Sequence, residues 1–159
     1  FKKNSDYSFN INNKMKTYLL TLSEFFPKTH SKAGMPTHFK ETFLNREKKH
    51  TIRANYPLWE KRIEEVQEGK AVLSVRQWTG KPYNSRQVEI ARLTAEDGVG
   101  IQLLEITNDF TECIVGDHRY SYVSVAKNDG LHPADWLDWF SCYDSSEPMA
   151  IIHFTNFRY

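Results

Sequence analysis

The amino-acid sequence predicts an α+β fold built on a small closed or half-closed β-barrel. Six or seven short segments alternate apolar and polar residues as strands do, and three others have the spacing of amphipathic helices. The predicted strands between residues 71 and 125 follow one another without helical crossovers, which disfavours a doubly wound parallel sheet. We therefore expect mostly antiparallel strands with about three flanking helices.

The domain organisation follows from length and composition. The chain has 159 residues and no internal repeat, which suits a single domain. Residues 1–14 are rich in Asn, Lys and Ser and show no sustained period. We expect them to be a flexible leader or a non-native extension, with Met15 as a candidate native start, and we expect the single domain to cover residues 15–159.

The individual elements are predicted from their hydrophobic periods. Alternation typical of strands is found at residues 16–22, 50–54, 73–78, 88–90, 101–106, 120–125 and 149–157. Helical spacing is found between Pro36 and Arg46, over 57–69 and over 134–143. The middle helix is the clearest, because Trp59, Ile63 and Val66 share one face between an opening proline and a closing glycine.

One predicted strand changes its apolar phase. Ile101 and Leu103 alternate with polar neighbours, and then Leu104 and Ile106 take over the apolar positions. Such a slip indicates a β-bulge, or a strand that turns between two sheet faces at a barrel corner.

Composition excludes several classes of protein. Lys and Arg number 21 against 20 Asp and Glu, so nucleic-acid binding would need a local basic patch. Cys113 and Cys142 are isolated, which is typical of reduced core cysteines. No apolar run approaches the roughly 20 residues of a membrane span, and no signal peptide begins the sequence. We expect a soluble, cytoplasmic protein without a membrane partner.

Common catalytic and metal motifs are absent from the sequence. It contains no GxSxG, HExxH, phosphate-binding loop or dinucleotide-binding motif. None of the six histidines pairs with a carboxylate four residues away. We therefore expect neither a metal site nor a cofactor.

The first polar cluster is the stretch from Arg46 to Arg53. Basic residues near the end of a helix are often only a solvated surface that the helix dipole favours. If residues 50–54 form a strand, however, Thr51 and Arg53 point to the same side just beyond Lys48. Both interpretations stay open on this stretch alone.

The second cluster is the segment Trp78–Gln87. It has the composition of an ordinary turn between strands. It also combines the charges of Lys81 and Arg86 with the aromatic faces of Trp78 and Tyr83. Basic and aromatic side chains together are suited to single-stranded nucleic acid or to a single base.

The two clusters, in this order, resemble the ASCH domain of the PUA-like superfamily. The resemblance rests on Lys48-Lys-His-Thr-Ile-Arg53, on Trp78-Thr-Gly-Lys-Pro-Tyr-Asn-Ser-Arg-Gln87 and on Asn128-Asp-Gly-Leu131 followed by Asp135-Trp-Leu-Asp-Trp-Phe140. It spans about residues 16–157 and is similar to ASCH-type proteins of phages and gut bacteria. It implies a PUA-like pseudobarrel, in agreement with the strand count and the phase slip.

The resemblance also implies two activities. The superfamily includes RNA-binding modules, readers of modified bases and a bacterial amidohydrolase that acts on N4-acetylcytidine. The catalytic lysine and threonine of that enzyme fall on Lys48 and Thr51. Its glutamate falls on Asp129, whose side chain is one methylene shorter. A hydroxyl beside an amine base is a known arrangement for attack on an amide.

Three functions remain as hypotheses. The first is an RNA- or nucleotide-binding module that presents Arg53, Trp78, Lys81, Tyr83 and Arg86 to its ligand. The second is an amidohydrolase acting on a modified nucleoside, with Lys48, Thr51 and Asp129 as catalytic residues. The third is a structural or partner-binding domain without a nucleic-acid role.

Overall fold

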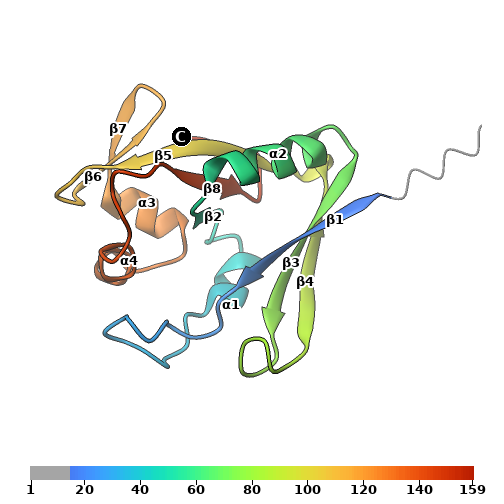
Figure 1. The fold of residues 1–159 in the computed structure, drawn as a ribbon, viewed down its shortest axis with the longest axis horizontal. Coiled ribbons are helices and arrows are strands. Elements are labelled where there is room, and N and C mark those ends of the chain that lie inside the picture. The colour runs from blue at the N-terminus through green and yellow to red at the C-terminus, as the bar shows by residue number, and fades with distance from the viewer. Residues whose placement is uncertain (1–14) are drawn as a thin grey trace, which may run out of the picture.

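Eight strands and four α-helices make up the part of the chain that the computed structural model describes, residues 15–159 (Figure 1). In chain order the elements are β1 (Lys16–Leu22), α1 (Phe39–Leu44), β2 (His50–Arg53), α2 (Tyr56–Gln67), β3 (Ala71–Trp78), β4 (Gln87–Leu93), the short 3-10 helix η1 (Ala95–Asp97), β5 (Gly100–Ile106), β6 (Glu112–Val115), β7 (His118–Ser121), α3 (Tyr122–Asn128), α4 (Pro133–Phe140) and β8 (Met149–His153). The predicted leader, residues 1–14, lies outside the described residues.

The strands form two sheets. The smaller sheet has the order β1-β3-β4, in which β1 and β3 run parallel and β3 and β4 antiparallel. The larger sheet has the order β2-β8-β5-β6-β7, and all its pairs are antiparallel. Within the described residues the chain changes sheet three times: from β1 to β2 through α1, from β2 to β3 through α2, and from β4 to β5 through η1.

The predicted α+β class is confirmed, but the predicted closed or half-closed barrel is not. Within residues 15–159 both sheets are open, and no strand pairs with strands of both. Among the described strands β1 and β4 are the edges of the smaller sheet, and β2 and β7 are the edges of the larger one. Eight strands replace the six or seven expected, and four α-helices replace three.

The additional helix is α3, which takes residues 122–125 of the strand predicted over 120–125, while residues 120 and 121 belong to β7. Tyr122, Val123 and Val125 are residues that favour strands, which explains the error. The helix begins because the Ser121 side chain accepts a hydrogen bond from the Val123 N–H, as an N-cap does. Its buried face, Val125 and Ala126, then decides in favour of the helix.

The phase slip in β5 has a different origin from the one predicted. The pairing of β5 with β6 and with β8 keeps one register throughout. Among the described residues the only shift of register lies between Val75 and Arg76, in the β3–β4 pair. In β5, Leu104 and Ile106 share their face with Gln102. The slip arises because this polar residue occupies an inward position, where it contacts His153 and the C-terminal segment.

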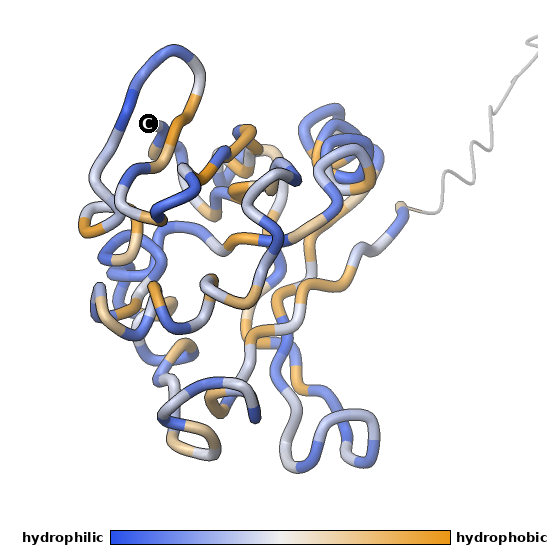
Figure 2. Tube along the Cα trace, turned by 60° about the vertical axis from the view of Figure 1, so that its left-hand side comes forward, coloured by the Kyte–Doolittle hydropathy of each residue, from blue (hydrophilic) through white to orange (hydrophobic). Residues whose placement is uncertain are grey.

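Helix α2 joins the two sheets through their apolar faces, since it packs on β3 of the smaller sheet and on β5 and β8 of the larger one. Its buried residues are Trp59, Ile63 and Val66, as predicted, and Ile63 and Val66 have no exposed surface. Burial of this face is the main stabilising term for the helix. In Figure 2 hydrophobic and hydrophilic stretches alternate along the chain, and the loop that projects at the lower right is coloured white to blue. None of the helices in residues 15–159 has the length and apolar character needed to span a bilayer.

Candidate functional site

Four of the predicted site residues meet in one cavity of about 300 Å³. Thr51 and Arg53 reach it from β2, and Lys48 precedes that strand by two residues. Asp129 comes from the end of α3, 81 residues further along the chain than Lys48. The convergence that the resemblance implied for Lys48, Thr51 and Asp129 is therefore present in the fold.

Backbone contacts bring the two segments together. The N–H of Lys49 donates to the carbonyl of Asn128 at 2.7 Å. Helix α3 ends immediately after Asn128, and Gly130 adopts a left-handed conformation with φ of 77°. The Leu131 N–H then returns to the Ala126 carbonyl at 3.0 Å, which closes the helix end.

Gly130 is required for a second reason. A Cβ placed at this position would lie 3.0 Å from both the Cβ of Lys48 and the Oγ1 of Thr42. The close approach of Lys48 to the backbone at Gly130 also explains why an aspartate is long enough at position 129. Its carboxylate reaches the Lys48 ammonium without the additional methylene of a glutamate.

Lys48 and Asp129 form a buried ion pair. The Lys48 Nζ donates to the Asp129 Oδ1 and to the Asp129 carbonyl oxygen, both at 2.7 Å. The side chains are 1% and 4% exposed. The Lys48 Nζ also lies 4.1 Å from the centre of the Phe39 ring.

Burial acts on both charges of this pair. It lowers the pKa of Lys48, and the Asp129 carboxylate partly opposes that shift while the nearby Arg53 adds to it. Burial likewise raises the pKa of Asp129, against the attraction of Lys48 and Arg53. The two shifts narrow the difference between the pKa of Lys48 and the pKa of Asp129, so transfer of a proton between the two groups costs less free energy. Shifted pKa values of this kind are common among the acids and bases of active sites.

Thr51 and Arg53 complete the polar wall of the cavity. Arg53 donates from Nη2 to the Thr21 carbonyl at 2.6 Å, so β2 is linked to β1 at this point. The Thr51 side chain is buried at the cavity wall. Thr51 therefore lines the same cavity as the ion pair, and within residues 15–159 no hydrogen bond joins its hydroxyl to Lys48 or Asp129.

Aromatic side chains make up much of the remaining wall. Sequence reasoning did not assign them to the site; they are Phe39, Trp139, Phe140 and Tyr143. The rings of Phe39 and Trp139 have centroids 5.7 Å apart. The signal for two of these residues was already in the stretch from Asp135 to Phe140, where aromatic residues end the last helix.

The second predicted cluster lies outside the cavity. Trp78 ends β3, and Lys81, Tyr83 and Arg86 belong to the β3–β4 turn, so none of the four lines the cavity. The rings of Trp78 and Tyr83 have centroids 5.3 Å apart, and Tyr83 is 89% exposed. The turn is nevertheless connected to the cavity, because the Gln87 amide at its base donates to the Oγ1 of Thr21, a cavity residue, at 3.4 Å.

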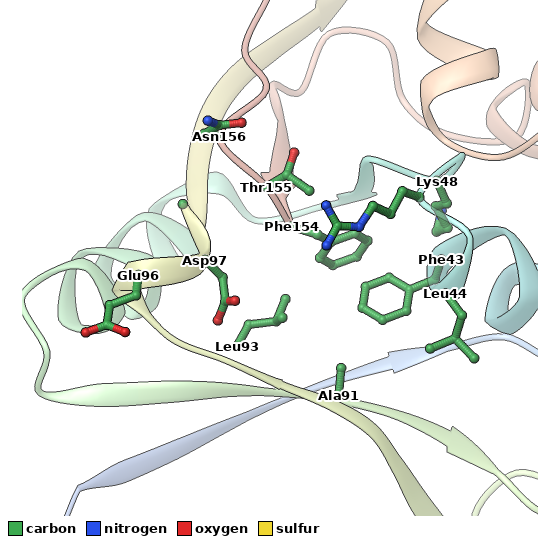
Figure 3. A pocket seen from close by; sticks show the side chains of 12 residues that line it. Phe43, Leu44, Lys48, Ala91, Leu93, Glu96, Asp97, Phe154, Thr155 and Asn156 are labelled. Carbon is green, nitrogen blue, oxygen red and sulfur yellow. The ribbon is translucent and has the colours of Figure 1, made fainter.

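A separate hollow of about 440 Å³ lies between α1 and the segment from β4 to η1 (Figure 3). Figure 3 shows the carboxylates of Glu96 and Asp97 on one side of it and Phe43 and Leu44 on the other. The Asp97 carboxylate is already occupied, since it accepts the Thr94 N–H at 2.8 Å. Lys48 also borders this hollow, but Thr51 and Asp129 do not. Lys48, Thr51 and Asp129 therefore meet only in the smaller cavity.

The described part of the chain holds no group of three or more His, Cys, Asp and Glu side chains placed to bind a metal ion. Comparison of the chain with protein-family models, with curated proteins and with solved structures finds no match.

The dual role of Gly130 generates a prediction with a matched control. Replacement of Gly130 by Ala should destabilise the protein by about 1–2 kcal/mol through the left-handed backbone, and by about 1–3 kcal/mol more through contact with Lys48. Gly69 occupies the same place after α2, with φ of 74° and no atom within 4 Å of a Cβ. Gly69→Ala should therefore show only the backbone cost. Chemical denaturation measures both, and equal losses would contradict the close approach at Gly130.

Proposed function

We propose that the cavity binds a single nucleobase, in a free nucleoside or in an RNA strand. The observation that supports this most is the Lys48–Asp129 pair, buried at a cavity that Arg53 and several aromatic rings also line. A base needs donors and acceptors for its edge and flat apolar surfaces for its faces. The cavity supplies all of these in about 300 Å³, at the lower end of the usual size of ligand pockets.

The charges indicate which edge fits best. Asp129 offers a carboxylate acceptor, and Lys48 and Arg53 offer charged donors. An amino-bearing base such as cytosine or adenine donates from its amino group and accepts at the adjacent ring nitrogen, which matches this set. Uracil has the reverse pattern on its Watson–Crick edge, because it accepts at O4 and donates from N3.

The turn between β3 and β4 would contact the rest of an RNA ligand. Lys81 and Arg86 would neutralise phosphates there, and Tyr83 is exposed enough to stack on a neighbouring base. The net charge of +1 argues against strong binding of long RNA through its backbone alone. Binding that depends on one base in a cavity is compatible with this charge.

A second candidate function is hydrolysis of an N4-acylated cytidine, which the short Lys48–Asp129 distance favours. A neutral Lys48 would take the proton of the Thr51 hydroxyl as its oxygen attacks the acyl carbon. Lys48 would return that proton to the N4 nitrogen as the carbon–nitrogen bond breaks, and water would then release the acid from Thr51. The similarity of Lys48-Lys-His-Thr-Ile-Arg53 to the ASCH domain of the PUA-like superfamily supports both candidates.

The binding proposal predicts where amide NMR signals change on titration. Cytidine and adenosine, more than uridine, should shift the signals of residues 51–53 and 129–131 and leave the turn at 79–86 unchanged. A short single-stranded RNA should shift both regions. Tyr83→Ala should weaken RNA binding by about 1–3 kcal/mol and leave nucleoside affinity unchanged.

A lysine pair provides the control for the RNA contact. Lys81→Ala should reduce the slope of the logarithm of RNA affinity against the logarithm of salt concentration by about one, the change expected for the loss of one phosphate contact. Lys70→Ala, at the other end of β3, should not change it. If neither nucleosides nor RNA shift the signals of residues 51–53 at millimolar concentration, the binding proposal is wrong.

The hydrolytic candidate is tested by incubation with N4-acetylcytidine and chromatography of the products. Lys48→Ala and Thr51→Ala should each abolish release of cytidine, and the double variant should be hardly worse, because residues that act as a unit are not additive. Binding of N4-acetylcytidine without any turnover at high protein concentration would leave the cavity as a binding site only.

A further inference from the structure

A second layer of polar side chains lies behind the ion pair. His50, on the opposite side of β2 from Thr51, has no exposed surface, and its Nε2 is 2.6 Å from the Tyr159 hydroxyl. The Asn128 amide donates to that same hydroxyl at 3.1 Å. The Nδ1 of His50 has no hydrogen-bond partner and is 3.8 Å from the Oδ1 of Asp129.

These contacts determine which ring nitrogen of His50 carries the proton. Burial lowers the pKa of His50 well below its usual value, so the ring is neutral and has one N–H. A tyrosine hydroxyl has one hydrogen, and among residues 15–159 only the His50 Nε2 is placed to accept it, because the Asn128 amide is a donor. Tyr159 therefore donates to Nε2, and the proton of His50 is on Nδ1.

The Asp129 carboxylate leads to the same tautomer independently. A lone pair on Nδ1 would face a carboxylate oxygen at 3.8 Å, which is repulsive, whereas an N–H there is attractive. The Trp136 indole N–H is also buried without a hydrogen bond of normal geometry, yet it lies near enough to lower the pKa of Asp129. The Lys48 ammonium thus donates to this carboxylate, and the Nδ1 of His50 lies 3.8 Å from the same oxygen.

We propose that His50 is a positioning residue for Asp129, with Tyr159 fixing its Nδ1–H tautomer. The His50 N–H keeps the carboxylate ionised and turned toward Lys48 and the cavity. A movement of under about 1 Å by Asp129 would complete the hydrogen bond when a ligand competes for Lys48. The relevance to a ligand rests on the proposed function, but the tautomer and its effect on Asp129 do not.

The neighbouring histidine provides an internal comparison. His153 pairs with His50 across the two strands, and their ring centroids are 5.6 Å apart. Its Nε2 lies 2.9 Å from Oε1, the side-chain oxygen of Gln102, which can only accept, so His153 carries its proton on Nε2. Burial also lowers its pKa to about 3, so it is neutral as well. Two adjacent neutral histidines should therefore have opposite tautomers.

The experiment is ¹⁵N NMR of the histidine rings in the ligand-free full chain, which distinguishes a protonated nitrogen from one with a lone pair. We expect a protonated Nδ1 in His50 and a protonated Nε2 in His153. Tyr159→Phe should convert His50 to a mixture of tautomers. Observation of His50 protonated on Nε2 in the unmodified protein would overturn the inference.

Two substitutions separate positioning from a structural role. An asparagine at position 50 retains an N–H near the place of Nδ1, and a glutamine retains one near Nε2. His50→Gln should change the carboxyl ¹³C signal of Asp129 and weaken cytidine binding about three- to tenfold, and His50→Asn should change both much less. If the two substitutions change the Asp129 signal and the cytidine affinity equally, His50 has a structural role only. If the NMR results hold but no nucleoside binds, the proposed function fails and the positioning of Asp129 stands.

Discussion

Removal of two opposite charges from water is the constraint on which the site depends. Lys48 and Asp129 are almost wholly buried, and such a pair is tolerated only when its geometry is close and its remaining hydrogen-bonding groups have partners. The carbonyl of Asp129 takes a second bond from the Lys48 ammonium, and the Phe39 ring lies against the same group. Loss of either charge would leave the other unpaired in a low-dielectric interior.

This constraint explains the local architecture around the pair. Helix α3 has to end at Asn128 so that the Asp129 carboxylate leaves the helix toward β2, and Gly130 has to lack a Cβ so that Lys48 can approach. The bond from Lys49 to Asn128 fixes the spacing of the two segments. On the far side of the carboxylate, His50, Asn128 and Tyr159 form a polar layer that an apolar core would not require.

Sequence reasoning found the parts of this site that have local signals. The alternation of residues 50–54 placed Thr51 and Arg53 on one side of a strand, and the motif resemblance brought Asp129 to Lys48. It failed where tertiary contacts override local preference: Tyr122, Val123 and Val125 favour a strand but form a helix, and Gln102 imitates a phase slip. The roles of Phe39, Tyr143 and Tyr159 depend on contacts between distant segments, and no spacing in the sequence indicates them.

The most direct test of this account is a double-mutant cycle on the ion pair, measured by chemical denaturation at neutral pH. Lys48→Met and Asp129→Asn should each cost about 3–5 kcal/mol of unfolding free energy, because each leaves a buried charge without its partner. The double variant should cost less than the sum of the two by at least about 1.5 kcal/mol. Strict additivity would show that the two charges do not depend on each other and would contradict the account.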